Sequence, residues 1–208
     1  MQRLKWILAT LVLFVNLLIA QPSWADPGKF IKSADYLEVT QAIDALIQAK
    51  NNPDTQENGI NINQKLASLQ LQKYILETSE ERARCSNQTG KNLAVYLKPK
   101  KATASQPIPL SYLGAGESSD DDFTCAGVYL PAETQVEFSP LAEVQTLAEP
   151  LVLKIVEGTQ FTVAADPETG LITFNIPPAQ LLKGEVTGWT IPVLAQADID
   201  AQTPNAAD

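Results

Sequence analysis

The chain has 208 residues, a formal net charge of −9 at pH 7 and no histidine, and its only methionine is Met1. Without histidine, neither a Ser-His-Asp or Cys-His nucleophile system nor a histidine-ligated zinc, copper or haem site can be built. The negative charge disfavours nucleic acid and anionic lipid as partners, and the sequence contains no phosphate-binding, dinucleotide-binding or nucleophile-elbow motif.

Residues 1–25 predict a removable secretory signal. Arg3 and Lys5 precede an apolar stretch at residues 6–20, which Ser23 and Ala25 follow in a small-residue cleavage pattern. The stretch is shorter than the roughly 20 residues that span a bilayer, although an uncleaved signal anchor is the alternative. Cleavage after residue 25 leaves 183 residues, a formal net charge of −11 and no methionine.

This signal resembles those of precursors exported to a bacterial periplasm or to the thylakoid lumen of photosynthetic bacteria. The resemblance covers only the first 25 residues and implies a location, not a function. We therefore expect the mature protein in the periplasm, the thylakoid lumen or the cell exterior.

A helical hairpin is predicted between residues 33 and 85. Residues 33–50 carry an apolar stripe at helical spacing, with Ser33 as the N-cap, and a polar linker at 54–59 leads to a second helical pattern. A charged, solvated turn at residues 80–84 is expected to end the second helix. Two helices joined by a short loop should pack antiparallel.

From residue 91 to 194 the apolar pattern favours β-structure. Short β-rich runs are predicted at residues 93–97, 108–113, 124–130, 135–139, 151–156, 160–164, 171–176 and 186–193. Turn signals at 157–158 and 166–170 predict that residues 151–176 form a three-stranded antiparallel meander. Residues 179–183 are expected to form a helical turn, and residues 195–208 a disordered tail.

Cys85 and Cys125 are the only cysteines and predict one disulfide bond in an oxidising compartment. In the chain-entropy model such a bridge stabilises the fold by roughly 4 kcal/mol. Two separate thiols or a redox-active pair are the alternatives. The bridge would join the end of the second helix to a strand, so we expect a single α+β domain over residues 26–194. In it the N-terminal helical hairpin packs on a mainly antiparallel β-sheet or on a small sandwich or barrel.

Two charged clusters are candidate binding sites. Glu117, Asp120, Asp121 and Asp122 form an oxygen-rich segment of a kind that can hold calcium, although its spacing fits no EF-hand and a solvated loop is the alternative. A basic cluster of Lys98, Lys100 and Lys101 could dock an acidic partner, the alternative being a solvated turn.

Other candidate residues have structural alternatives. Tyr96, Tyr112, Tyr129 and Trp189 could line a binding face or pack in the core. Asn87 begins a glycosylation sequon, which matters only in a eukaryotic secretory host.

The sequence favours an exported, non-catalytic accessory or binding protein with a protein partner, one that assists or stabilises an envelope or membrane-associated complex. We predict no cofactor and no permanent membrane span after signal cleavage. The first alternative is an enzyme that acts on envelope carbohydrate through carboxylate or tyrosine chemistry. The second is a calcium or small-ligand binding module.

Overall fold

A computed structural model describes residues 28–51, 59–101, 106–139 and 142–206. The predicted signal at residues 1–25 lies outside these ranges. Across the ranges that are described, no helix combines the length and the apolar character needed to cross a membrane.

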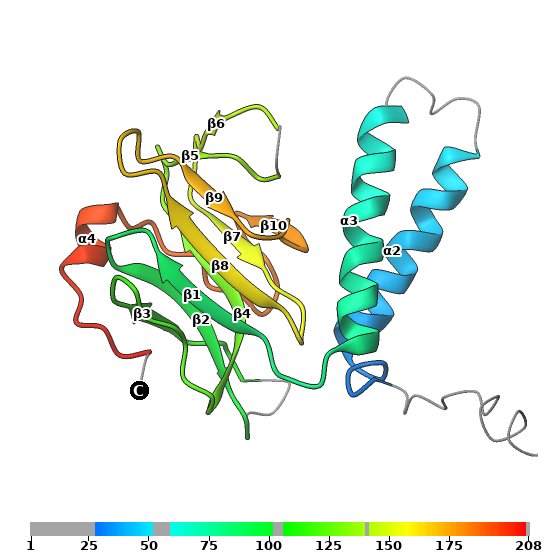
Figure 1. The fold of residues 1–208 in the computed structure, drawn as a ribbon, viewed down its shortest axis with the longest axis horizontal. Coiled ribbons are helices and arrows are strands. Elements are labelled where there is room, and N and C mark those ends of the chain that lie inside the picture. The colour runs from blue at the N-terminus through cyan, green and yellow to red at the C-terminus, as the bar shows by residue number, and fades with distance from the viewer. Residues whose placement is uncertain (1–27, 52–58, 102–105, 140–141, 207–208) are drawn as a thin grey trace, which may run out of the picture.

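The N-terminal part is a pair of antiparallel helices, α2 (Ala34–Lys50) and α3 (Gly59–Thr78) (Figure 1). Ser33 caps α2, as predicted, because its hydroxyl oxygen accepts a hydrogen bond from the Tyr36 backbone N–H at 3.1 Å. Val39 and Ile43 of α2 share an apolar cluster with Leu69 and Leu76 of α3. The helical hairpin is therefore confirmed.

The remainder forms two five-stranded sheets that face each other (Figure 1). The strand order in the first sheet is β1 (Arg84–Gln88), β8 (Gln160–Ala165), β9 (Ile172–Phe174), β5 (Gln135–Val136) and β6 (Gln145–Thr146). The order in the second is β10 (Gln180–Lys183), β7 (Leu151–Lys154), β4 (Phe123–Leu130), β2 (Leu93–Pro99) and β3 (Leu110–Leu113). Among the strands that the structure describes, only β1 with β8 and β5 with β9 pair in parallel. Over the described residues the fold is thus α+β, with a mainly antiparallel sandwich in which neither sheet closes into a barrel.

The main core lies between the sheets. Phe161 and Val163 of the first sheet and Val95, Leu97 and Leu153 of the second belong to one buried cluster. On the outer face of the second sheet, Tyr96 and Tyr129 are covered by the C-terminal segment, which contributes Trp189 and Ile199. These tyrosines are core residues.

The predicted meander over residues 151–176 is wrong in its first half. Strand β7 lies in the second sheet and β8 in the first, so the turn at Glu157 and Gly158 carries the chain from one sheet to the other. Alternation specifies which side chains point inward but not which sheet a strand joins. The β8–β9 hairpin is confirmed, with Gly170 at φ 72° in its turn.

Three further local predictions are wrong. Residues 179–183 contain strand β10 in place of a helical turn, and residues 186–193 hold only an isolated bridge between Val186 and Trp189. The second helix ends at Thr78, and Arg84 begins strand β1 where a solvated turn was expected.

The predicted disordered tail is corrected for residues 195–206. This segment contains helix α4 (Gln196–Asp200), and Ile199 is buried against the outer face of the second sheet. The Asn205 side-chain oxygen accepts a hydrogen bond from the Tyr112 backbone N–H at 2.9 Å. This bond gives a partner to a backbone donor of the edge strand β3. Two buried apolar side chains, Ile199 and Ala206, together with an edge strand order a segment whose composition is otherwise small and polar.

Candidate functional site

The predicted disulfide between Cys85 and Cys125 is present, and it links the two sheets because Cys85 lies in β1 and Cys125 in β4. Both cysteines are fully buried. The Cys125 backbone N–H also donates a hydrogen bond to the Ala83 carbonyl at 2.9 Å. The start of β1 is thereby fixed to β4 by both covalent and backbone bonds.

Alternation along the start of β1 directs two arginines outward. Ala83 and Cys85 are buried in the core, whereas Arg82 and Arg84 stay partly exposed. The Arg84 backbone N–H donates to the Thr159 carbonyl at 2.9 Å, and the Gln160 side chain donates to the Arg82 carbonyl at 3.0 Å. Both arginines therefore project from a well-anchored backbone.

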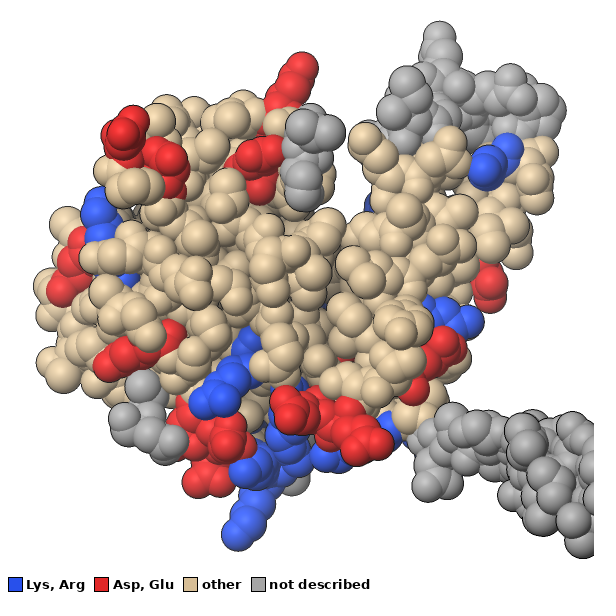
Figure 2. Space-filling model, in the orientation of Figure 1, with Lys and Arg blue, Asp and Glu red and all other residues tan. Residues whose placement is uncertain are grey.

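These arginines line a cavity of about 350 Å³ that we call the charged groove. Its lining consists of Lys29, Glu81, Arg82, Ala83, Arg84, Lys100, Asp120, Asp121, Phe123 and Gln160. Figure 2 shows charged side chains gathered along the lower rim of the molecule, where the base of the helical hairpin meets the sandwich. The four cations come from three chain segments: the start of the hairpin, the start of β1 and the turn after β2.

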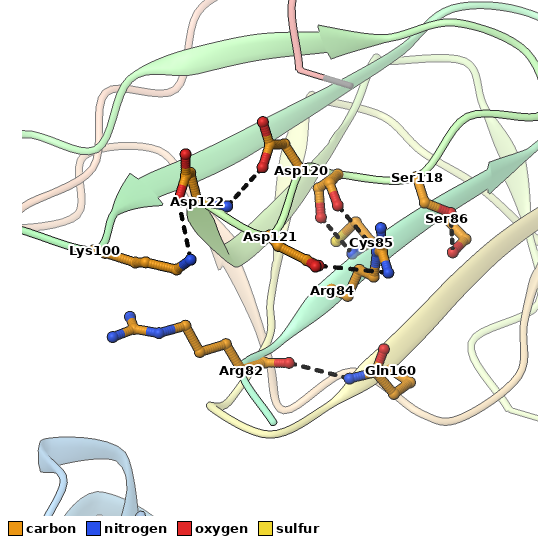
Figure 3. A network of polar contacts seen from close by, with 11 residues as sticks. Arg82, Arg84, Cys85, Ser86, Lys100, Ser118, Asp120, Asp121, Asp122 and Gln160 are labelled. Atoms are coloured by element: carbon orange, nitrogen blue, oxygen red, sulfur yellow. Dashed lines mark hydrogen bonds and ion pairs between the residues drawn. The ribbon is translucent and has the colours of Figure 1, made fainter. Parts of the chain in front are cut away.

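Each cation of the charged groove is held by a nearby oxygen. Arg82 donates to the Thr124 hydroxyl at 3.1 Å, and Lys29 donates to the Glu80 carbonyl at 3.2 Å. Arg84 donates through Nε to the Ser119 carbonyl at 3.0 Å, and its NH1 lies 3.5 Å from Asp121. In Figure 3 Arg82 extends toward the side of the groove on which Lys100 lies.

The four carboxylates of the predicted calcium site serve separate partners. Glu117 accepts a hydrogen bond from the Gly114 backbone N–H at 2.6 Å, and Asp120 accepts one from the Asp122 backbone N–H at 2.6 Å. Asp121 faces Arg84, and Asp122 lies 3.0 Å from Lys100 (Figure 3). Within the described part of the chain, no group of three or more His, Cys, Asp or Glu side chains is arranged to hold a metal ion. The geometry gives the calcium prediction no support.

The predicted basic cluster is only partly brought together. Lys100 lines the charged groove, but Lys98 and Lys101 are not among the lining residues. Lys98 is partly buried near the end of β2, opposite Thr124, and Lys101 is exposed in the turn after that strand.

Sequence reasoning missed Lys29, Arg82 and Arg84 as site residues. Lys29 lies 53 positions before Arg82 in the chain, so no local pattern connects them. For the two arginines a signal was available, because 82–85 alternates charged and small or apolar residues as a half-buried strand does.

Four cations line the charged groove together with Glu81, Asp120 and Asp121. Arginine presents planar, paired N–H donors that match a carboxylate, and lysine contributes a mobile point charge. Comparisons with protein-family models, with curated proteins and with solved structures found no match for this chain.

Proposed function

We propose that this protein is an exported, non-catalytic binding protein and that the charged groove is its partner-binding surface. The observation that carries the proposal is the convergence of Lys29, Arg82, Arg84 and Lys100, from three chain segments, on one cavity. The folded structure is needed to bring side chains from separate segments onto one surface. A solvated run of charges, by contrast, arises from neighbouring residues in the sequence alone. Arg82 and Arg84 are further fixed by the adjoining disulfide.

The partner chemistry that fits is an acidic protein segment. The groove already binds carboxylates of its own chain, since Arg84 faces Asp121 and Lys100 faces Asp122. Both aspartate side chains are more than four-fifths exposed. Exposed ion pairs of this kind contribute about 0–1 kcal/mol. An incoming acidic segment can therefore replace them at small cost and add bidentate contacts to Arg82 and Arg84.

The setting of this interaction is an oxidising compartment outside the cytoplasm, the periplasm or the thylakoid lumen. The predicted signal at residues 1–25 and the buried Cys85–Cys125 bridge support that setting. There the protein assists or stabilises an envelope or membrane-associated complex by holding an acidic segment of one component.

A cross-linking capture with the mature protein, residues 26–208, tests the proposal in envelope and membrane fractions of the native host. The groove variant is Lys29→Glu with Lys100→Glu, both at exposed positions. The control variant is Lys65→Glu with Lys183→Glu, which makes the same change in net charge at exposed positions outside the groove. We expect one partner to be captured by wild type and control and at least about tenfold less by the groove variant, the weakening that a loss of roughly 1.4 kcal/mol would produce.

Two results would overturn this assignment. One is equal capture of the partner by the groove variant and the control variant. The other is the absence of any protein enriched by the wild-type chain over an unrelated acidic protein.

A further inference from the structure

The helical hairpin rests on the sandwich through apolar contacts, including Leu71 and Ile75 of α3, and through a set of polar contacts. Val156 is the fully buried sandwich residue in the apolar cluster of the hairpin, with Ala179 packed partly against it. The Ser79 hydroxyl donates to the Gly158 carbonyl at 3.0 Å, and the Gln72 side chain donates to the Pro178 carbonyl at 3.3 Å. Because these contacts are polar, the charge of nearby side chains can change how strongly the hairpin docks on the sandwich.

Charged groups concentrate at one point of this contact. Lys154, in β7, pairs with Asp35 at 3.5 Å and with Glu38, both in α2. The Glu157 backbone N–H donates to Asp35 Oδ2 at 3.2 Å, which ties the turn after β7 to the first turn of α2. These bonds form only when the hairpin is docked.

The surroundings of the Glu157 carboxyl group disfavour its ionised form. Its Oε2 atom is enclosed and has no hydrogen-bond partner. Its own backbone N–H is bonded to the Asp35 carboxylate, so a second negative charge lies close by. An enclosed carboxylate oxygen without a partner is costly, and a neighbouring like charge adds to that cost.

We propose that the Glu157 carboxyl group acts as a proton-operated latch that holds the hairpin on the sandwich when protonated and releases it more readily when ionised. Protonation removes the charge from the enclosed oxygen and ends the repulsion from Asp35. Undocking exposes the carboxyl to water, where the ionised form is well solvated. Docking and proton binding at Glu157 are therefore coupled.

The electrostatic surroundings agree with this direction. Burial raises the pKa of Glu157 above its usual 4.5, and the Asp35 carboxylate raises it further. The cations Arg82, Lys98 and Lys29 act in the opposite direction and do not cancel the rise. Because the docked state binds the proton more tightly, docking is strongest below pH 4.5 as far as Glu157 is concerned. It weakens as the pH rises from 4.5 through the raised pKa.

Hydrogen exchange of the residue 157 backbone amide, followed by NMR, reports the latch directly, because that N–H is bonded to Asp35 in the docked state. Glu157→Gln keeps the backbone N–H of residue 157, and its neutral side chain mimics the protonated carboxyl group. The readout is the protection of this amide in wild type relative to Glu157→Gln from pH 4.5 to neutral pH. Contributions from titrating groups that do not interact with Glu157 are common to both proteins and drop out of the ratio, whereas that of Asp35 is part of the coupling being measured.

We expect the relative protection in wild type to fall tenfold for each unit by which docking raises the Glu157 pKa. Glu143→Gln, at an exposed position, should behave as wild type. Parallel profiles in wild type and Glu157→Gln would overturn the proposal. So would a carbon-detected titration of wild-type Glu157 that gives a pKa of 4.5, a result independent of how the variant folds.

Discussion

Cys85 in β1 and Cys125 in β4 are bonded across the core, with their Cα atoms 5.8 Å apart, so that one covalent link joins the two sheets. The bridge closes a sequence separation of 40 residues. Cys85→Ala with Cys125→Ala should therefore lower the free energy of unfolding by about 2–5 kcal/mol. Urea unfolding followed by far-UV circular dichroism measures this change.

The oxidised wild-type protein incubated with reductant provides the matched control. Because both sulfurs are buried, the native protein should keep its bridge and unfold at the wild-type urea concentration. A double variant that unfolds at the same urea concentration as wild type would show that the bridge does not hold the sheets together.

Asn87 is a structural residue whose side chain closes the end of β1. It is fully buried, and its Nδ2 donates to the carbonyls of Lys91, Leu113 and Gly114 at 2.7, 3.0 and 2.8 Å. Asn87→Ala removes the donor shared by these carbonyls and should destabilise the protein by about 1–3 kcal/mol. The control Asn63→Ala, at an exposed position of α3, should stay within about 0.5 kcal/mol of wild type. Equal unfolding midpoints for the two variants would contradict this role.

The buried tyrosines of the second sheet make the fold sensitive to alkali. Tyr96 donates to the Thr190 carbonyl at 2.7 Å, and burial raises its pKa to about 12. Burial also raises the pKa of Tyr129, whose hydroxyl donates to the Leu194 carbonyl at 2.9 Å. Unfolded tyrosine loses its proton near pH 10, so the folded state binds more protons from pH 10 to about 12 and its stability falls across that window.

Ultraviolet titration of tyrosinate, together with urea unfolding at stepped pH, checks this behaviour. Tyr74, which is 62% exposed on α3, offers the internal reference, because Tyr74→Phe should leave the fall in stability unchanged. Ionisation of Tyr96 near pH 10, or constant stability up to about pH 12, would contradict the structure.

The parts of the fold that local pattern determines were predictable. Ser33 and the stripe through Val39 and Ile43 specify α2, and the turn at Asp166 and Gly170 specifies the β8–β9 hairpin. The disulfide followed from there being only two cysteines. In each case a short stretch of sequence, or a simple count, contains the whole signal.

The parts that tertiary contacts determine were not predictable. Strand β1 is held by parallel pairing with β8, more than 70 residues later in the sequence. Ile199 is the one large apolar residue in a tail of small and polar residues, and its burial depends on packing against the outer face of the second sheet. The charged groove likewise joins Lys100 and Asp121, which the sequence places in two separate clusters, with the distant Lys29.

The assignment of the charged groove as the partner-binding surface is tested most directly by site-specific photo-cross-linking in the native host. A photoreactive amino acid replaces Gln160, which is exposed and lines the groove, and in a second protein it replaces Tyr74 on α3, outside the groove. We predict that the partner cross-links from position 160 and not from position 74, and that mass spectrometry places the link in a segment rich in aspartate or glutamate. Equal cross-linking from both positions, or a link to a segment without acidic residues, would contradict the proposed function.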